Sequence, residues 1–131
     1  MYRKHIYPLY AWYSGLGLYG GPSLEEVYDL LYQLGLAAKS TGFFHLAYTV
    51  RLAAWEPQRL LDPDWLYPET ARHYRTDPEM VEKDIRKLSS LAWKRAPDRL
   101  CRMAGTPLTR ALPPVQFLKI LAGHLRSGGA A

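Results

Sequence analysis

The sequence PETARHYRTDPEMVEKDIRKLSSLAWKR, residues 68–95, predicts two helices joined by a tight turn. A short helix should begin near Pro68, and residues 75–76 should form the connection. A longer helix should follow over 77–95, because Pro78 fits a first helical turn, where its missing N–H has no bond to lose. Two helices with a connection of about three or four residues form the helix-turn-helix, whose second helix enters the major groove of DNA.

The longer helix is amphipathic. Val81, Ile85, Leu88 and Ala92 recur at helical spacing and form one apolar stripe. The opposite face is polar and mostly charged, with Glu79, Glu82, Lys83, Arg86, Lys87, Ser90 and Lys94. This face can reach bases and phosphates, so the pattern predicts binding to double-stranded DNA.

Two sets of side chains are candidate DNA contacts. The candidates for base contacts are Glu82, Lys83 and Arg86, since a carboxylate can accept from cytosine and cationic groups can donate to guanine. The candidates for phosphate contacts, which set register and salt dependence, are Thr76, Lys87, Lys94 and Arg95. The alternative is an ordinary surface helix, on which Glu82 and Arg86 form an i,i+4 pair worth only about 0.2–0.5 kcal/mol.

The rest of the chain predicts further helices and no strand. Ser23 and Glu26 form a capping-box pattern at the start of a helix that Gly35 should end. Other helices are expected over 42–55, with Phe43, Leu46, Val50 and Ala54 on one side, over 97–103 and over 114–126, while 60–66 should be a connector. The expected fold is therefore an all-α, compact bundle of about six helices that contains a helix-turn-helix. The expected domain organisation is an irregular aromatic arm at 1–22, a helix-turn-helix domain at 23–126 and a disordered tail at 127–131.

The charge is unevenly distributed. Residues 1–93 hold ten Lys or Arg against eleven Asp or Glu, whereas residues 94–131 hold seven Lys or Arg against Asp98 alone. A basic C-terminal third suggests a polyanionic partner, although it is also compatible with a merely solubilising surface.

The cysteine, histidine and apolar content exclude several classes of protein. The single cysteine, Cys101, rules out an internal disulfide and fits a reducing, cytoplasmic location. No apolar run is long enough to span a membrane. The four histidines are scattered, without partners at ligand or triad spacing, so we expect no metal site, no cofactor, no catalytic residue and no enzymatic activity.

Several segments resemble one known family. They are LYPETA at 66–71, VEKDIRK at 81–87 and AWKR at 92–95, with weaker matches in GLAA at 35–38 and GF at 42–43. Residues Phe117, Ala122, Leu125 and Arg126 resemble the family's final helix. Together these segments resemble the C-terminal DNA-binding effector domain of the stage-zero sporulation response regulator, over about residues 24–126.

The resemblance implies a six-helix domain that binds promoter DNA, often as a dimer on paired sites, and contacts the sigma factor of RNA polymerase. It also implies that Glu82, Lys83 and Arg86 occupy DNA-contacting positions. Two residues depart from the family pattern, because Met80 and Lys83 stand where arginines are usual. Lysine lacks the bidentate geometry of arginine, so reading of guanine should weaken.

Two functions fit these observations. The first is a stand-alone, sequence-specific transcriptional regulator, without a receiver domain, that reads the major groove with helix 77–95. The second is a protein-interaction module of the same fold, with reduced or lost DNA binding, that modulates a full-length regulator. Met80 and the aromatic arm favour the second function, and the basic C-terminal third favours the first.

Overall fold

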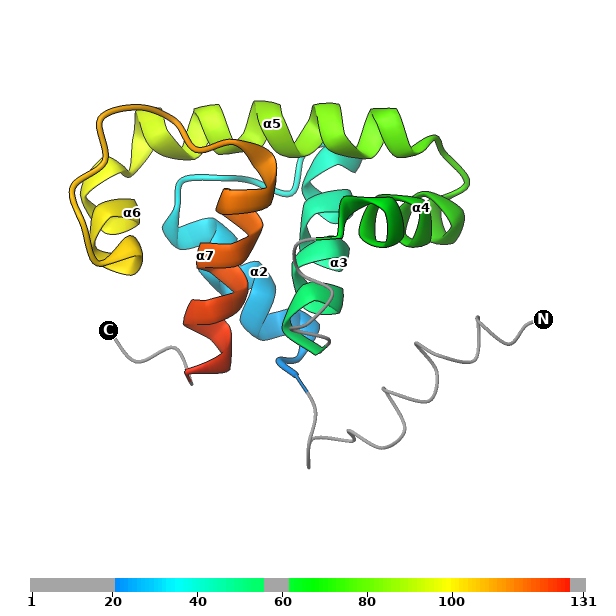
Figure 1. Cartoon of the computed structure of the whole chain (residues 1–131), viewed down its shortest axis with the longest axis horizontal. Helices are drawn as coiled ribbons and strands as arrows, with labels where there is room; N and C mark the ends of the chain where they lie inside the picture. Colours follow the sequence, from blue (N-terminus) through cyan, green and yellow to red (C-terminus); the bar gives the residue numbers. More distant parts are fainter. Residues whose placement is uncertain (1–20, 56–61, 128–131) are drawn as a thin grey trace.

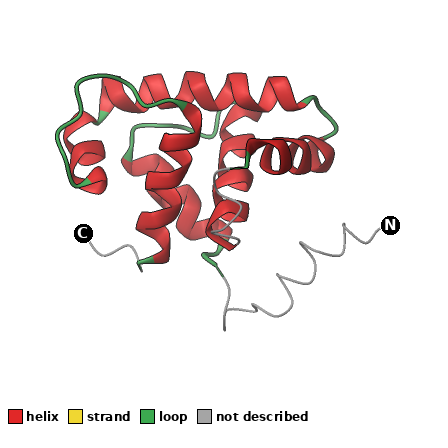
Figure 2. Ribbon diagram, in the orientation of Figure 1, coloured by secondary structure: helices red, strands yellow, loops and turns green. Residues whose placement is uncertain are grey.

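The computed structural model describes residues 21–55 and 62–127, and these form a bundle of six helices (Figures 1 and 2). The helices are α2 (Leu24–Gln33), α3 (Thr41–Trp55), α4 (Pro63–Tyr74), α5 (Pro78–Arg95), α6 (Pro97–Ala104) and α7 (Pro114–Arg126). The described part of the chain contains no strand, so the all-α prediction is confirmed. Nearly all of the expected arm and tail lie outside the described residues.

The start of α2 is as predicted. Ser23 Oγ accepts from the Glu26 backbone N–H at 3.1 Å, and the Ser23 backbone N–H donates to Glu26 Oε1 at 2.9 Å. The helix ends at Gln33, and Gly35 follows with a φ of +82°, a conformation that favours glycine. The predicted capping box and stop are both confirmed.

Helix α3 is the centre of the bundle and contacts α2, α4, α5 and α7. The prediction that its buried residues line one side is incomplete. Besides Phe43, Leu46, Val50 and Ala54, the buried residues of α3 include Gly42, His45, Ala47, Thr49, Leu52 and Ala53. Its sequence has no wide polar face because neighbouring helices surround it.

Helix α4 begins earlier than predicted, which contradicts two predictions. The expected start near Pro68 is wrong, and so is the expected connector over 63–66, because α4 already begins at Pro63; residues 60–61 of that connector lie outside the described part of the chain. Pro63 lies in the first turn, where proline costs no hydrogen bond. Pro68 lies inside the helix, but it is exposed, as is Asp64, whose carbonyl would otherwise accept the missing N–H.

The other predicted helices agree with the structure to within one or two residues. Helix α5 runs along one edge of the bundle, with α4 beneath its first half and α6 and α7 toward its end (Figure 1). The other described helices therefore leave one side of α5 uncovered along its length. Among the described residues, no helix is long and apolar enough to cross a bilayer.

Candidate nucleic-acid interface

The turn between α4 and α5 has a defined geometry. Arg75 ends α4 in the left-handed conformation, with φ 56° and ψ 51°. The Thr76 N–H then donates to the Ala71 carbonyl at 2.9 Å, which closes the end of α4 in the manner of a Schellman motif. Because α5 starts at Pro78, only residues 75–77 separate the two helices. The structure therefore contains the predicted helix–turn–helix arrangement.

The buried side of α5 holds it against the bundle. All four residues of the predicted apolar stripe, Val81, Ile85, Leu88 and Ala92, are buried. Ser89 is buried too, and its Oγ donates to the Leu112 carbonyl at 2.7 Å in the segment before α7.

Two polar contacts join α4 and α5 to the central helix. His45 Nδ1 of α3 lies 2.8 Å from Asp84 Oδ2 of α5. The Oγ1 atoms of Thr49 and Thr70 lie 2.7 Å apart and join α3 to α4. Both motif helices are thus positioned by the same buried helix.

The candidate base contacts lie on the uncovered side of α5. Lys83 is exposed, and the side chains of Glu82 and Arg86 are 45% and 60% exposed. Arg86 Nη2 donates to Glu82 Oε2 at 3.1 Å, so these two residues form the i,i+4 pair that the alternative interpretation anticipated. Met80 is also exposed, at 44%, so the first turn of α5 presents an apolar side chain on this face.

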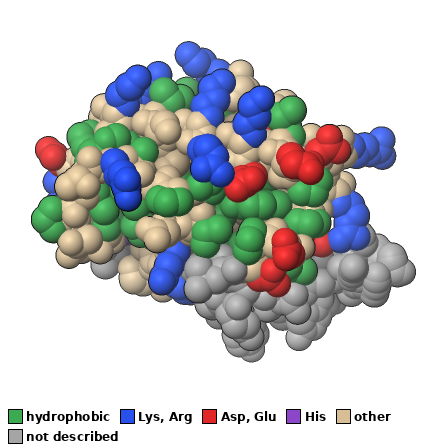
Figure 3. All heavy atoms as spheres, turned by 45° about the horizontal axis from the view of Figure 1, so that its top comes forward, with side chains coloured by type: hydrophobic (Ala, Val, Ile, Leu, Met, Phe, Trp, Pro, Cys, Tyr) green, Lys and Arg blue, Asp and Glu red, His purple; other side chains and the backbone are tan. Residues whose placement is uncertain are grey.

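The candidate phosphate contacts are spread along a longer surface. Lys87, Lys94 and Arg95 are exposed, whereas Thr76 is half-buried in the turn. Lys94 lies eleven residues beyond Lys83, which corresponds to about 16 Å along the helix axis. Figure 3 shows Lys and Arg side chains spread over this face of the molecule, with most of the acidic side chains toward its right side.

Arg95 has an additional role that its position in the sequence did not indicate. Its Nη1 donates to the Gly35 carbonyl at 2.7 Å, which joins the end of α5 to the segment after α2. A Cβ atom added at Gly35 would lie 2.8 Å from Arg95 Cβ, so the two backbones approach closely.

Sequence reasoning missed Tyr67, which it treated only as part of a family motif. Tyr67 is 6% exposed, and its hydroxyl is buried without a hydrogen-bond partner among the described residues. It lines a hollow of about 310 Å³ with Pro68 of α4 and Pro78, Glu79 and Glu82 of α5. Burial, reinforced by Glu82 and opposed by Arg86, raises the pKa of Tyr67 to about 12, so the hydroxyl keeps its proton and remains a donor. The sequence gives no signal for this, because α4 was expected to begin after Tyr67.

A ring cluster covers the junction of α3 and α4. His73 stacks on Tyr48 with ring centroids 4.2 Å apart, and Tyr74 lies 5.0 Å from the His45 ring. Burial lowers the pKa of His73, and Glu69 partly opposes this effect. No group of three or more His, Cys, Asp or Glu able to hold a metal occurs within 21–55 and 62–127.

Comparison with known proteins identifies one family. The family model described as "Sporulation initiation factor Spo0A C terminal" matches residues 27–124. The matched region runs from within α2 to the last turn of α7 and includes the whole of α4 and α5. No curated protein matches the chain.

Proposed function

The chain belongs to the family of the C-terminal domain of the sporulation initiation factor Spo0A, and we propose that it is a sequence-specific transcriptional regulator that reads duplex DNA with α5. The observation that carries this proposal is the uncovered, largely basic side of a helix that directly follows a three-residue turn. In this proposal residues 23–126 act as the effector domain.

Base readout is assigned to the first half of α5. Lys83 and Arg86 donate to guanine acceptors in the major groove, and Glu82 accepts from a cytosine amine. The bond between Arg86 and Glu82 is exposed and weak, so the guanidinium can exchange its carboxylate partner for a base at little cost. Met80 offers an apolar contact, of the kind that a thymine methyl group accepts.

Phosphate contacts are assigned to Thr76, Lys87, Lys94 and Arg95. The three cations are exposed and lie on the uncovered part of α5 or at its end. Arg95 uses Nη1 for the Gly35 carbonyl, and its remaining N–H groups are left for a phosphate. Release of counterions from three such contacts predicts a loss of affinity of roughly 40-fold between about 50 mM and about 200 mM salt.

The family also suggests a dimer on paired DNA sites and contact with the sigma factor of RNA polymerase. Both belong to the proposal. A duplex with two sites should bind two copies more tightly than two separate single-site duplexes if the dimer forms on DNA.

The second candidate function is a protein-interaction module of the same fold. It is favoured by Met80 and by the acidic Glu79 and Glu82 on the uncovered side, which would repel phosphates. In that case the same surface would bind a full-length regulator instead of DNA.

Fluorescence anisotropy distinguishes the two functions. Labelled duplexes carrying a sporulation-regulator box or its scrambled sequence would be titrated at low and at higher salt. Tighter binding to the box, together with the steep salt dependence given above, supports the regulator. Absence of binding to either duplex at low salt would overturn it in favour of the interaction module.

A further inference from the structure

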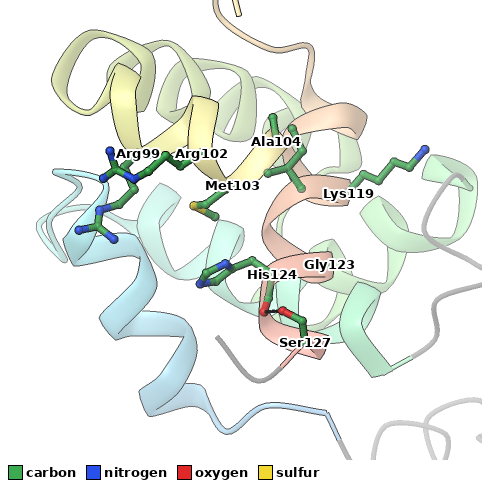
Figure 4. A pocket seen from close by; sticks show the side chains of 9 residues that line it. Arg99, Arg102, Met103, Ala104, Lys119, Gly123, His124 and Ser127 are labelled. Carbon is green, nitrogen blue, oxygen red and sulfur yellow. Dashed lines mark hydrogen bonds between the residues drawn. The ribbon is translucent and has the colours of Figure 1, made fainter. Parts of the chain in front are cut away.

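A hollow of about 390 Å³ lies between α6 and α7, on a part of the molecule that the DNA proposal does not use (Figure 4). Its lining includes Arg99, Arg102 and Met103 of α6 and Lys119, Ile120 and His124 of α7. The volume falls at the small end of the range of about 300–1,000 Å³ that is usual for ligand pockets.

The hollow is lined by cations and by no carboxylate. Arg99, Arg102 and Lys119 form no ion pair with any described residue, and no Asp or Glu belongs to the lining. Asp98 lies one turn before Arg102 on α6, yet the two side chains are not paired. Arg99 and Arg102, three residues apart on α6 and without a described counterion, raise the local positive potential, which favours an anion.

The directions of the side chains fit one anionic group. In Figure 4 the Arg99 and Arg102 side chains extend from α6 to the same end of the hollow, and the His124 ring points from α7 toward Met103. Arg99 Nη1 donates to Gln33 Oε1 at 3.0 Å, which holds this side chain in place and leaves its other N–H groups for a ligand. In the same view Lys119 extends away from α6 and from the two arginines, so it is not part of the charged end.

The rest of the lining is apolar and open. Met103 and Ile120 are half-buried and supply hydrocarbon surface from both helices. Gly123 leaves room between the helices, because a Cβ atom added there would meet nothing within 4 Å. A ligand that fits both parts has a negative group and a short apolar body.

We propose that this hollow is a binding site for a small organic anion, whose charged group is held by Arg99 and Arg102 and whose apolar body lies on Met103 and Ile120. Guanidinium groups bind carboxylates and phosphates through charge-assisted, often bidentate hydrogen bonds. The proposal is independent of DNA binding, because none of these residues is a candidate DNA contact.

The test is an NMR titration of the ¹⁵N-labelled full chain, without DNA, using octanoate as the probe. Saturable shifts of the amide signals of Arg102, Met103, Gly123 and His124 are expected. Acetate has the charge without the body, and octylammonium has the body with the opposite charge, so both should bind much more weakly. Equal affinity for octanoate and acetate, or for octanoate and octylammonium, would overturn the proposal.

Two matched pairs of variants sharpen the test. Arg102→Gln should weaken octanoate binding about tenfold or more. Arg110 lies in the loop before α7, outside the lining, so Arg110→Gln should leave the affinity for octanoate unchanged. Gly123→Leu should block the hollow without changing its charge, whereas Gly123→Ala should keep binding. Equal losses of octanoate affinity in Arg102→Gln and Arg110→Gln would show a general effect of charge. Full affinity in Gly123→Leu would show that octanoate binds elsewhere. Either result contradicts the proposed site.

Discussion

His45 Nδ1 and Asp84 Oδ2 lie 2.8 Å apart and join the most central helix, α3, to the helix with the uncovered basic side, α5. The His45 side chain is 6% exposed and that of Asp84 is 21% exposed, so water has little access to the contact. Gly42, one turn before His45, allows the approach, since a Cβ atom there would lie 3.2 Å from Asp84 Cβ. A polar contact, besides apolar packing, therefore determines where α5 lies.

Asp84→Ala should destabilise the fold by about 1–3 kcal/mol, because it leaves a buried imidazole N–H without an acceptor. Asp84→Asn keeps an acceptor oxygen in the same place and should cost less. The free energies of unfolding from urea denaturation check this order. Equal losses in the two variants would mean that the hydrogen bond contributes nothing beyond the packing of the side chain.

Gly35→Ala should destabilise the protein more than Gly105→Ala. Both glycines have positive φ angles, +82° and +74°, so each alanine incurs about 1–2 kcal/mol of backbone strain. Only at Gly35 would the new Cβ also lie 2.8 Å from Arg95 Cβ, whereas at Gly105 it meets nothing within 4 Å. Thermal unfolding of the two variants isolates this clash, and similar melting temperatures would show that Arg95 moves aside freely.

Arg86→Ala should weaken binding to the specific DNA site by about 1–3 kcal/mol while leaving binding to a scrambled duplex nearly unchanged. The fold should be preserved, because the Arg86 side chain is 60% exposed and its bonded partner is Glu82 on the same helix. Anisotropy gives the two affinities and circular dichroism gives the helix content. A variant with normal helix content and normal specific affinity would remove Arg86 from the base-contacting set.

Lys94→Ala should weaken binding to specific and scrambled DNA alike and should reduce the slope of log K against log salt by about 1. The exposed Arg126, at the end of α7 that points away from α5, provides the control (Figure 1). Arg126→Ala should leave the slope unchanged. A loss in Lys94→Ala that is confined to the specific duplex would contradict a phosphate role.

His73→Gln should reduce the loss of stability on acidification. The pKa of His73 lies below its ordinary value of 6.5, so the folded state binds this proton less readily than the unfolded chain does. Stability from the neutral ring is therefore complete above about pH 6.5 and falls as the pH drops through the lower folded-state pKa. Melting temperatures between about pH 7.5 and about pH 5 should fall less in the variant than in the original chain, and parallel curves would show that His73 does not titrate with unfolding.

The helices could be predicted from the sequence where local rules act alone. The capping box of Ser23 and Glu26, the proline in the first turn of α5 and the apolar stripe of Val81 and Ile85 all depend on residues within a few positions. The start of α4 was mispredicted because Pro63 and Pro68 both fit the first turn of a helix. Burial of Leu66 and Tyr67, a tertiary effect, favours the earlier start.

The links that position α5 could not be predicted from spacing. His45 and Asp84 are 39 residues apart, and Arg95 and Gly35 are 60 residues apart. The Tyr67 hydroxyl is buried without a hydrogen-bond partner among the described residues because of the way α4 packs beside α5. Such contacts form only when the helices pack together. Sequence patterns therefore identified which side of α5 is polar, but not which residues of other segments hold α5 in position.

Helix α5 is fastened at two points, near its middle by Asp84 to α3 and at its last residue by Arg95 to the segment after α2. A helix fixed in this way has already lost its freedom to pivot when the protein folds, so docking a partner on it requires little further ordering. If the shapes of α5 and its partner do not match, the partner must deform, and the free energy of that deformation weakens binding. For a DNA duplex this favours sequences that bend cheaply, including at base pairs that no side chain of α5 touches.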